Sequence, residues 1–169
     1  SGTGTQSHAL PHGGCGRGTY TACECTEEYN REYNVCLCHY RNVWTALPNL
    51  PQAQKVHMGY GTTDASVSAG GNVPAGCTTN LFNWDGSTWS SGDDLILGKQ
   101  EAGATGTQNA GIIFGGLHTA GDCYDCVECY NGTAWNTGTI IPISVYNHRA
   151  TGDQDCALIF GGRDNRSND

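Results

Sequence analysis

An eleven-residue pattern that ends in a double glycine occurs four times in this chain of 169 residues, and it constrains the fold more than any other feature. The four copies align without a gap, and their starts are 57, 45 and 46 residues apart. Such a period is typical of an array of repeated supersecondary units. The copies are GTQSHALPHGG from Gly4, GTTDASVSAGG from Gly61, GTQNAGIIFGG from Gly106 and GDQDCALIFGG from Gly152; these four residues are the array glycines.

A second landmark keeps the same spacing. Trp44, Trp89 and Trp135 each lie 17 residues before the next array glycine. The longer first interval is explained by an insertion near residues 31–42. We therefore expect a single repeat array over residues 1–169, with unit 1 at 4–60, unit 2 at 61–105, unit 3 at 106–151 and a partial unit 4 at 152–169.

Each unit is expected to consist of short β-strands. The segment AGIIFGG is an apolar run bounded by glycines, which favours a buried strand. Asp85-Gly86 and Asn131-Gly132 lie between aromatic residues and predict hairpins with two-residue type I′ turns. No segment has a sustained helical period, so we predict an all-β chain of about three and a half four-stranded antiparallel units.

Charge and hydropathy exclude two classes of partner. The net charge of −8 argues against binding nucleic acid through its phosphates. The sequence has no run of 18 apolar residues, so we expect no membrane insertion.

The repeat unit resembles the kelch repeat, whose copies form the blades of β-propellers. The segments TEEYN (26–30), WDGSTW (84–89) and YNGTAW (130–135) are similar to kelch-like repeats in structural proteins of marine bacteriophages and environmental viruses. The resemblance implies propeller blades and an extracellular or virion-surface location. Three and a half units cannot close a ring that normally needs four to eight blades. The units could be completed by other copies or neighbouring particle subunits, could be a fragment of a longer propeller, or could pair end to end into a filament.

We expect a non-catalytic structural or recognition protein that presents loops to a receptor, a host-surface glycan or a neighbouring subunit, with no cofactor. The rival hypothesis is a fragment of a copper enzyme similar to galactose oxidase, which carries its metal on kelch-type blades. Tyr146 and His148 are the candidate ligands, but Asn147 separates them and the six histidines show no ligand spacing.

Ten cysteines, an even number, predict disulfide bonds and an oxidising compartment. Cys23, Cys77 and Cys123 follow the double glycines at comparable places, which predicts that some bonds staple equivalent loops. The full set of disulfide candidates is Cys15, Cys23, Cys25, Cys36, Cys38, Cys77, Cys123, Cys126, Cys129 and Cys156.

Metal binding is the alternative for these cysteines. The segment CYDCVEC has the spacing of a ferredoxin run, but the fourth cysteine is missing. The CEC and CLC segments could hold zinc with His39, and Asp122 with Asp125 could hold calcium. We expect no metal site.

The remaining predictions concern surfaces. The recurring aromatic residues are expected to pack between adjacent blades: Trp44, Trp84, Trp89, Tyr130 and Trp135. The apolar strand of Ala157, Leu158, Ile159 and Phe160 lacks the second half of its unit, so we expect an assembly edge there, with the insertion of unit 1 as a candidate contact. Asn131 and Asn165 lie in N-glycosylation sequons, although a hairpin turn alone accounts for Asn131.

Overall fold

The structure is a computed structural model that describes the backbone of residues 2–4, 8–15, 22–34 and 39–164, and the side chains from Thr45 to Asp164. These residues form strands and connecting loops, with no helix among them. The strands are β1 (Gly2–Gly4), β2 (His8–Cys15), β3 (Ala22–Asn34), β4 (His39–Leu47), β5 (Met58–Gly61), β6 (Ser66–Ala69), β7 (Asn72–Val73), β8 (Gly76–Cys77), β9 (Leu81–Trp84), β10 (Trp89–Ser91), β11 (Gly103–Thr107), β12 (Ala110–Phe114), β13 (Val127–Tyr130), β14 (Trp135–Thr137), β15 (Arg149–Gly152) and β16 (Ala157–Phe160).

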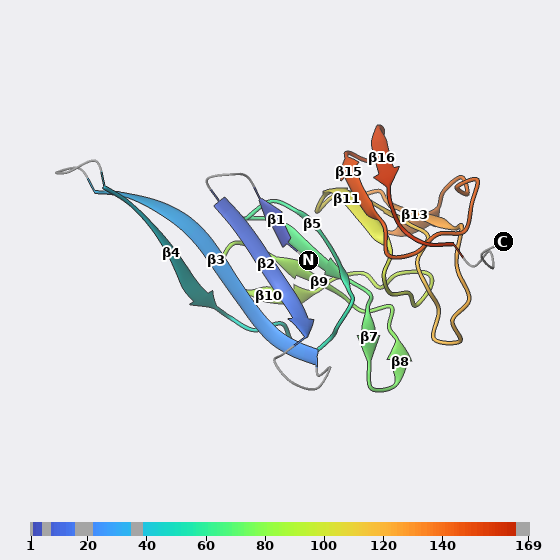
Figure 1. The fold of residues 1–169 in the computed structure, drawn as a ribbon, viewed down its shortest axis with the longest axis horizontal. Coiled ribbons are helices and arrows are strands. Elements are labelled where there is room, and N and C mark those ends of the chain that lie inside the picture. Colours follow the sequence, from blue (N-terminus) through green and yellow to red (C-terminus); the bar gives the residue numbers. More distant parts are fainter. Residues whose placement is uncertain (1, 5–7, 16–21, 35–38, 165–169) are drawn as a thin grey trace.

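The strands form three four-stranded antiparallel sheets and two hairpins (Figure 1). Sheet 1 has the order β1-β2-β3-β4, sheet 2 has β10-β9-β6-β5, and sheet 3 has β11-β12-β13-β14. Strands β15 and β16 form the C-terminal hairpin, and β7 with β8 forms a small hairpin between β6 and β9. The prediction of an all-β chain with four-stranded antiparallel sheets is therefore confirmed.

The array glycines close the first hairpin of each sheet. Gly61, Gly106 and Gly152 have φ angles of 105°, 109° and 109°, which residues with a side chain rarely adopt. A Cβ atom at Gly106 would also collide with the carbonyl oxygen of Ala110 across the turn. The sheets consequently begin one strand before the array glycine, because β5, β11 and β15 each pair with the strand that follows the turn.

In the double glycines at 70–71, 115–116 and 161–162, both residues adopt left-handed backbone angles. Gly70 and Gly71 have φ angles of 56° and 103°, and Gly115 and Gly116 have 57° and 101°. Their N–H groups bond to loop carbonyls; that of Gly71, for example, donates to the Lys99 carbonyl at 2.8 Å. The recurrence of these pairs is thus required by backbone geometry.

The hairpin loops at Asp85 and Asn131 differ from the prediction. Trp84 pairs with Trp89, so residues 85–88 form a four-residue loop, and a two-residue type I′ turn is wrong here. A type I′ turn needs positive φ at both central residues, whereas only Gly86 has it. Asp85 Oδ1 instead accepts hydrogen bonds from the N–H groups of Ser87 (2.8 Å) and Thr88 (2.7 Å), and residues 131–134 repeat this arrangement.

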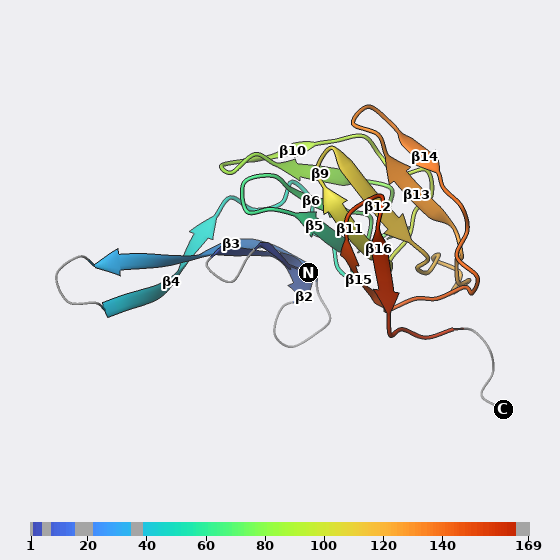
Figure 2. The same cartoon turned by 90° about the horizontal axis from the view of Figure 1, so that it is seen from above.

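The first strands of successive sheets lie side by side. Strand β1 contacts β5, β5 contacts β11, and β11 contacts β15, and the remaining strands of sheets 2 and 3 extend away from this line (Figure 2). The β3–β4 hairpin projects from the rest of the molecule (Figure 1). The described residues form no closed ring of sheets.

Two apolar clusters fill the spaces between sheets. Sheets 2 and 3 share a cluster that includes Met58, Val67, Ile113 and Trp135. A second cluster of Ile112, Phe114 and Val127 on sheet 3 packs against Ala150 and Ile159 of the C-terminal hairpin. Sheet 2 therefore buries apolar side chains against sheet 3, and sheet 3 buries others against the C-terminal hairpin.

Candidate functional site

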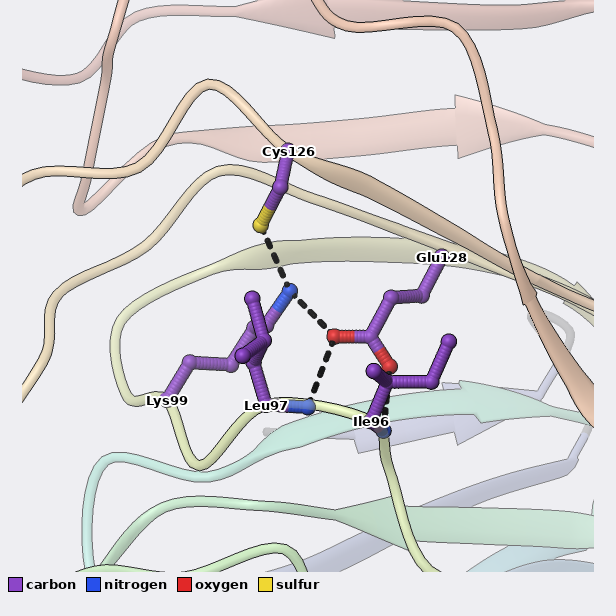
Figure 3. Close-up of polar contacts among 5 residues, drawn as sticks. All are labelled: Ile96, Leu97, Lys99, Cys126 and Glu128. Atoms are coloured by element: carbon purple, nitrogen blue, oxygen red, sulfur yellow. Dashed lines mark hydrogen bonds and ion pairs between the residues drawn. The ribbon is translucent and has the colours of Figure 1, made fainter.

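A buried polar cluster connects sheet 2 to sheet 3 (Figure 3). Lys99 lies on the loop between β10 and β11, and its Nζ is 2.7 Å from Oε1 of Glu128 on β13. The two side chains are 0% and 2% exposed. This junction cluster comprises Lys99, Glu128, Cys126 and the main-chain N–H groups of Ile96 and Leu97.

Hydrogen bonds compensate both charges of the junction cluster. Glu128 Oε2 accepts from the N–H of Ile96 at 2.8 Å, and Oε1 accepts from the N–H of Leu97 at 3.3 Å. The Lys99 ammonium also donates to Cys126 Sγ at 3.1 Å. A buried ion pair needs such additional partners, because the attraction alone does not repay the loss of hydration. The cluster fixes the loop of residues 92–102 against β13.

Tyr124 lies next to the junction cluster. Its ring centroid lies 5.7 Å from Lys99 Nζ, within the range of a cation–π contact. Burial, followed by the charges of Cys126 and Cys77, raises the pKa of the Tyr124 hydroxyl. The phenol therefore stays protonated near neutral pH.

A second feature, the axial pocket, lies where the first strands meet. Its volume is about 320 Å³, and equivalent positions from three units line it: residues 56–59, 101–104 and 147–150. Val56, Glu101 and Asn147 begin the three lining segments with φ angles of 50°, 56° and 55°. The N–H of Glu101 donates to the Val56 carbonyl (3.0 Å), and the N–H of Asn147 donates to the Glu101 carbonyl (2.7 Å). One backbone motif therefore links each unit to the next.

The polar side chains of the axial pocket are Glu101, Asn147, Arg149 and two histidines, His57 and His148. His148 Nε2 accepts a hydrogen bond from the N–H of Gly103 at 3.0 Å. Burial lowers the pKa of His148, and the neighbouring positive charge of Arg149 acts in the same direction. The lining contains no serine, threonine or cysteine.

The third feature is the terminal face, formed by Leu158 and Phe160 on β16. Their exposed fractions are 62% and 51%. The equivalent residues of sheet 3, Ile112 and Phe114, are only 8% and 6% exposed. Of the predicted edge, Ala157 is also exposed, whereas Ile159 is half-buried against the sheet 3 cluster. Side chains of one type at one repeat position are thus covered in sheet 3 and uncovered in the C-terminal hairpin.

Five of the ten cysteines have described side chains, and all five are free thiols: Cys77, Cys123, Cys126, Cys129 and Cys156. The predicted staple between the loops of Cys77 and Cys123 is absent, because these two thiols are unbonded. The Cys77 N–H instead bonds to Thr119 Oγ1 at 2.7 Å, so a hydrogen bond connects the two loops. The other candidates, Cys15, Cys23, Cys25, Cys36 and Cys38, lie outside the described side chains.

The described side chains contain no group of three or more histidine, cysteine or acidic residues placed to hold a metal ion. The segment CYDCVEC does not bring its cysteines into such a group, and Asp122 and Asp125 do not form one. Of the two candidate copper ligands, Tyr146 pairs through its backbone with Arg163, and His148 is bonded to Gly103. His39 lies outside the described side chains.

The recurring aromatic residues form cross-strand pairs within each sheet. The ring centroids of Trp84 and Trp89 are 5.3 Å apart, and so are those of Tyr130 and Trp135. Trp44, whose side chain is not described, pairs through its backbone with Tyr29 in the same register. Trp135 also donates from Nε1 to the Asp93 carbonyl of the preceding unit at 3.0 Å.

Both sequons remain predictions of glycosylation. Asn131 is exposed at the tip of its loop, and its Oδ1 accepts hydrogen bonds from the N–H groups of Thr133 and Ala134. Asn165 lies outside the described residues.

Sequence reasoning did not identify Lys99, Glu128 or, apart from His148, the positions that line the axial pocket. The one available signal was the charge of Glu128 between Val127 and Cys129 in an otherwise apolar strand. A search against models of known protein families and a search of curated proteins each returned no match to the chain. Within the described residues, no helix is long and apolar enough to cross a membrane.

Proposed function

We propose that the chain is a non-catalytic structural and recognition protein of the kelch-like propeller type, which works by assembling with further copies of itself or with neighbouring subunits. The observation that carries this proposal is the contrast between Leu158 and Phe160 and their buried equivalents Ile112 and Phe114. In sheet 3, Ile112 and Phe114 are covered in part by Ala150 and Ile159 of the C-terminal hairpin. Leu158 and Phe160 repeat this apolar pattern, so we expect another polypeptide segment to pack on them in the same way.

A second copy of the chain is the occupant that we propose for the terminal face. The first strands already pack next to one another from sheet to sheet, and the backbone motif at Val56, Glu101 and Asn147 repeats at each junction. A repeat geometry of this kind can continue across a boundary between chains. Strand β16 pairs only with β15 among the described strands, so its outer edge can accept another strand.

The resemblance to viral kelch-like repeats supports a location on a virion surface or in an extracellular assembly. The loops at the sheet ends would then face a receptor or a host-surface glycan, as loops on rigid scaffolds commonly do.

The test is the mass of the native protein in solution. We expect wild type to sediment as a discrete species of more than one chain, and the double variant Leu158→Lys with Phe160→Lys to sediment as a monomer with an unchanged far-ultraviolet spectrum. Ile140→Lys is the matched control, because Ile140 is 61% exposed and is not part of β16. A wild-type protein that remains monomeric at high concentration would contradict the proposal, and a large heterogeneous species would indicate a filament.

A further inference from the structure

The junction cluster places an amine and a thiol in direct contact. Lys99 Nζ lies 3.1 Å from Cys126 Sγ, and Glu128 Oε1 lies on another side of the same nitrogen at 2.7 Å (Figure 3). The Lys99 side chain has no exposed surface, so its amine is confined to these partners. Cys126, in contrast, is half-buried.

We propose that Lys99 and Cys126 form an oxidative crosslink, a sulfur–nitrogen bond made with a peroxide as oxidant. In the first step the Cys126 thiol reacts with hydrogen peroxide to give a sulfenic acid and one water. In the second step the Lys99 amine attacks the sulfur, the S–N bond forms, the S–OH bond breaks, and a second water leaves. A sulfenic acid is known to condense with a nearby nitrogen in this way.

Glu128 supplies the proton acceptor that the second step needs. The nitrogen attacks as a neutral amine, so the ammonium first loses a proton, and Oε1 is within hydrogen-bond distance to receive it. The resulting carboxyl group remains held, because the N–H groups of Ile96 and Leu97 lie at the same two oxygens. The sulfur is oxidised by two electrons and the peroxide is reduced by two electrons, so the sequence balances without another reactant.

The chain offers few competing amines for this reaction. It contains two lysines, Lys55 and Lys99, and Lys55 lies on the segment that leads into β5, next to Asn72. The free thiol of Cys156 is exposed, which makes it the reference for unassisted oxidation. A bond from Lys99 to Cys126 would join the loop of residues 92–102 to the start of β13, across 27 positions of sequence. It would therefore hold the loop that follows sheet 2 against sheet 3, the kind of role for which the sequence predicts disulfide bonds.

The experiment treats the purified full-length chain with limited hydrogen peroxide and blocks the remaining thiols with an alkylating reagent. Peptides are then mapped without reduction. In a digest that cleaves after Asp and Glu, which separates Lys99 from Cys126 at Glu101, we expect one crosslinked species that joins the Lys99 and Cys126 peptides, about 2 Da lighter than their sum because two hydrogens are lost. Trypsin should no longer cut at Lys99, and a thiol reductant should restore both peptides.

Four variants locate the bond. The crosslink should be lost in Cys126→Ser and in Lys99→Arg, which keeps the positive charge without a free amine. It should persist in Cys129→Ser and Lys55→Arg. If Lys99→Arg does not fold, the wild-type peptide map and the tryptic resistance at Lys99 still decide the matter. Recovery of Cys126 as a sulfinic acid or a disulfide, with Lys99 unmodified, would overturn the proposal, as would a crosslink to Lys55.

Discussion

The main-chain N–H of Gly103 donates a 3.0 Å hydrogen bond to Nε2 of His148, 45 positions later in the chain. Because Nε2 accepts, the imidazole is neutral and its proton is on Nδ1. The glycine is equally constrained, since a Cβ atom at position 103 would lie 2.6 Å from the His148 ring. The pair joins β11 to the segment that leads into β15, so it holds the C-terminal hairpin against sheet 3.

Acid should weaken this junction. The pKa of His148 is lowered in the folded protein, so the unfolded chain binds a proton more readily. Stability is then fully present above the ordinary histidine pKa of about 6.5 and falls as the pH drops below it toward the lowered value. We expect chemical-denaturant midpoints to decrease over this window, and His148→Gln, which carries no titrating ring, to show a smaller decrease. Equal slopes in the two proteins would rule out His148 as the source.

A methyl group at position 103 should disrupt the same contact. Gly103→Ala forces the His148 ring to move and removes its hydrogen bond, and overpacking of this kind costs about 1–3 kcal/mol. His148→Ala alone leaves a cavity and an unpaired N–H, and it should also destabilise the protein. The double variant should lose less than the sum of the two single variants, because removal of the imidazole ring leaves room for the new methyl. Additive losses in denaturant unfolding would show that the two residues are not coupled.

Breaking the Lys99–Glu128 pair should be costly. Glu128→Gln leaves a buried ammonium without a counter-charge, and loss of one partner from a buried pair costs about 3–5 kcal/mol. Replacing both residues, Lys99→Met with Glu128→Gln, should recover part of that loss because the unpaired charge is gone. Urea unfolding of the three proteins measures the difference. A single variant as stable as wild type would mean that the ammonium finds water or another partner.

The repeated part of the fold could be predicted from sequence because backbone geometry imposed it. From unit 2 onward the array glycines and double glycines recur since each has a positive φ at a turn, and such positions leave a visible mark in the residue type. The aromatic pairs Trp84–Trp89 and Tyr130–Trp135 recur for a related reason, because the two residues of each pair lie opposite each other across one hairpin. The repeat period, the number of strands per unit and their pairing can be inferred from these recurring glycines and aromatic residues.

The junction cluster could not be predicted, because its partners come from different units and occur once. Lys99 occupies a position where unit 3 has Val145, and both residues accept a double-glycine N–H through their carbonyls. The repeat therefore constrains the backbone at this position but does not constrain the type of side chain. The turn type was missed because Asp85 caps its own loop through Oδ1, an option that the dipeptide Asp-Gly does not reveal.

Two glycines separate the effect of backbone strain from the effect of a close contact. Gly106 and Gly121 both have positive φ angles, of 109° and 88°, so alanine is strained at either position. A Cβ atom at Gly121 meets nothing within 4 Å, whereas one at Gly106 collides with the carbonyl oxygen of Ala110.

We expect Gly121→Ala to cost about 1–2 kcal/mol from strain alone. Gly106→Ala should cost a further 1–3 kcal/mol, on the order found for overpacked sites, because the first hairpin of sheet 3 must open to admit the methyl. Thermal and urea unfolding of the two variants give the comparison directly. Equal losses would indicate that the turn at Gly106 relaxes freely, and the recurrence of the array glycines would then need a cause other than this close approach.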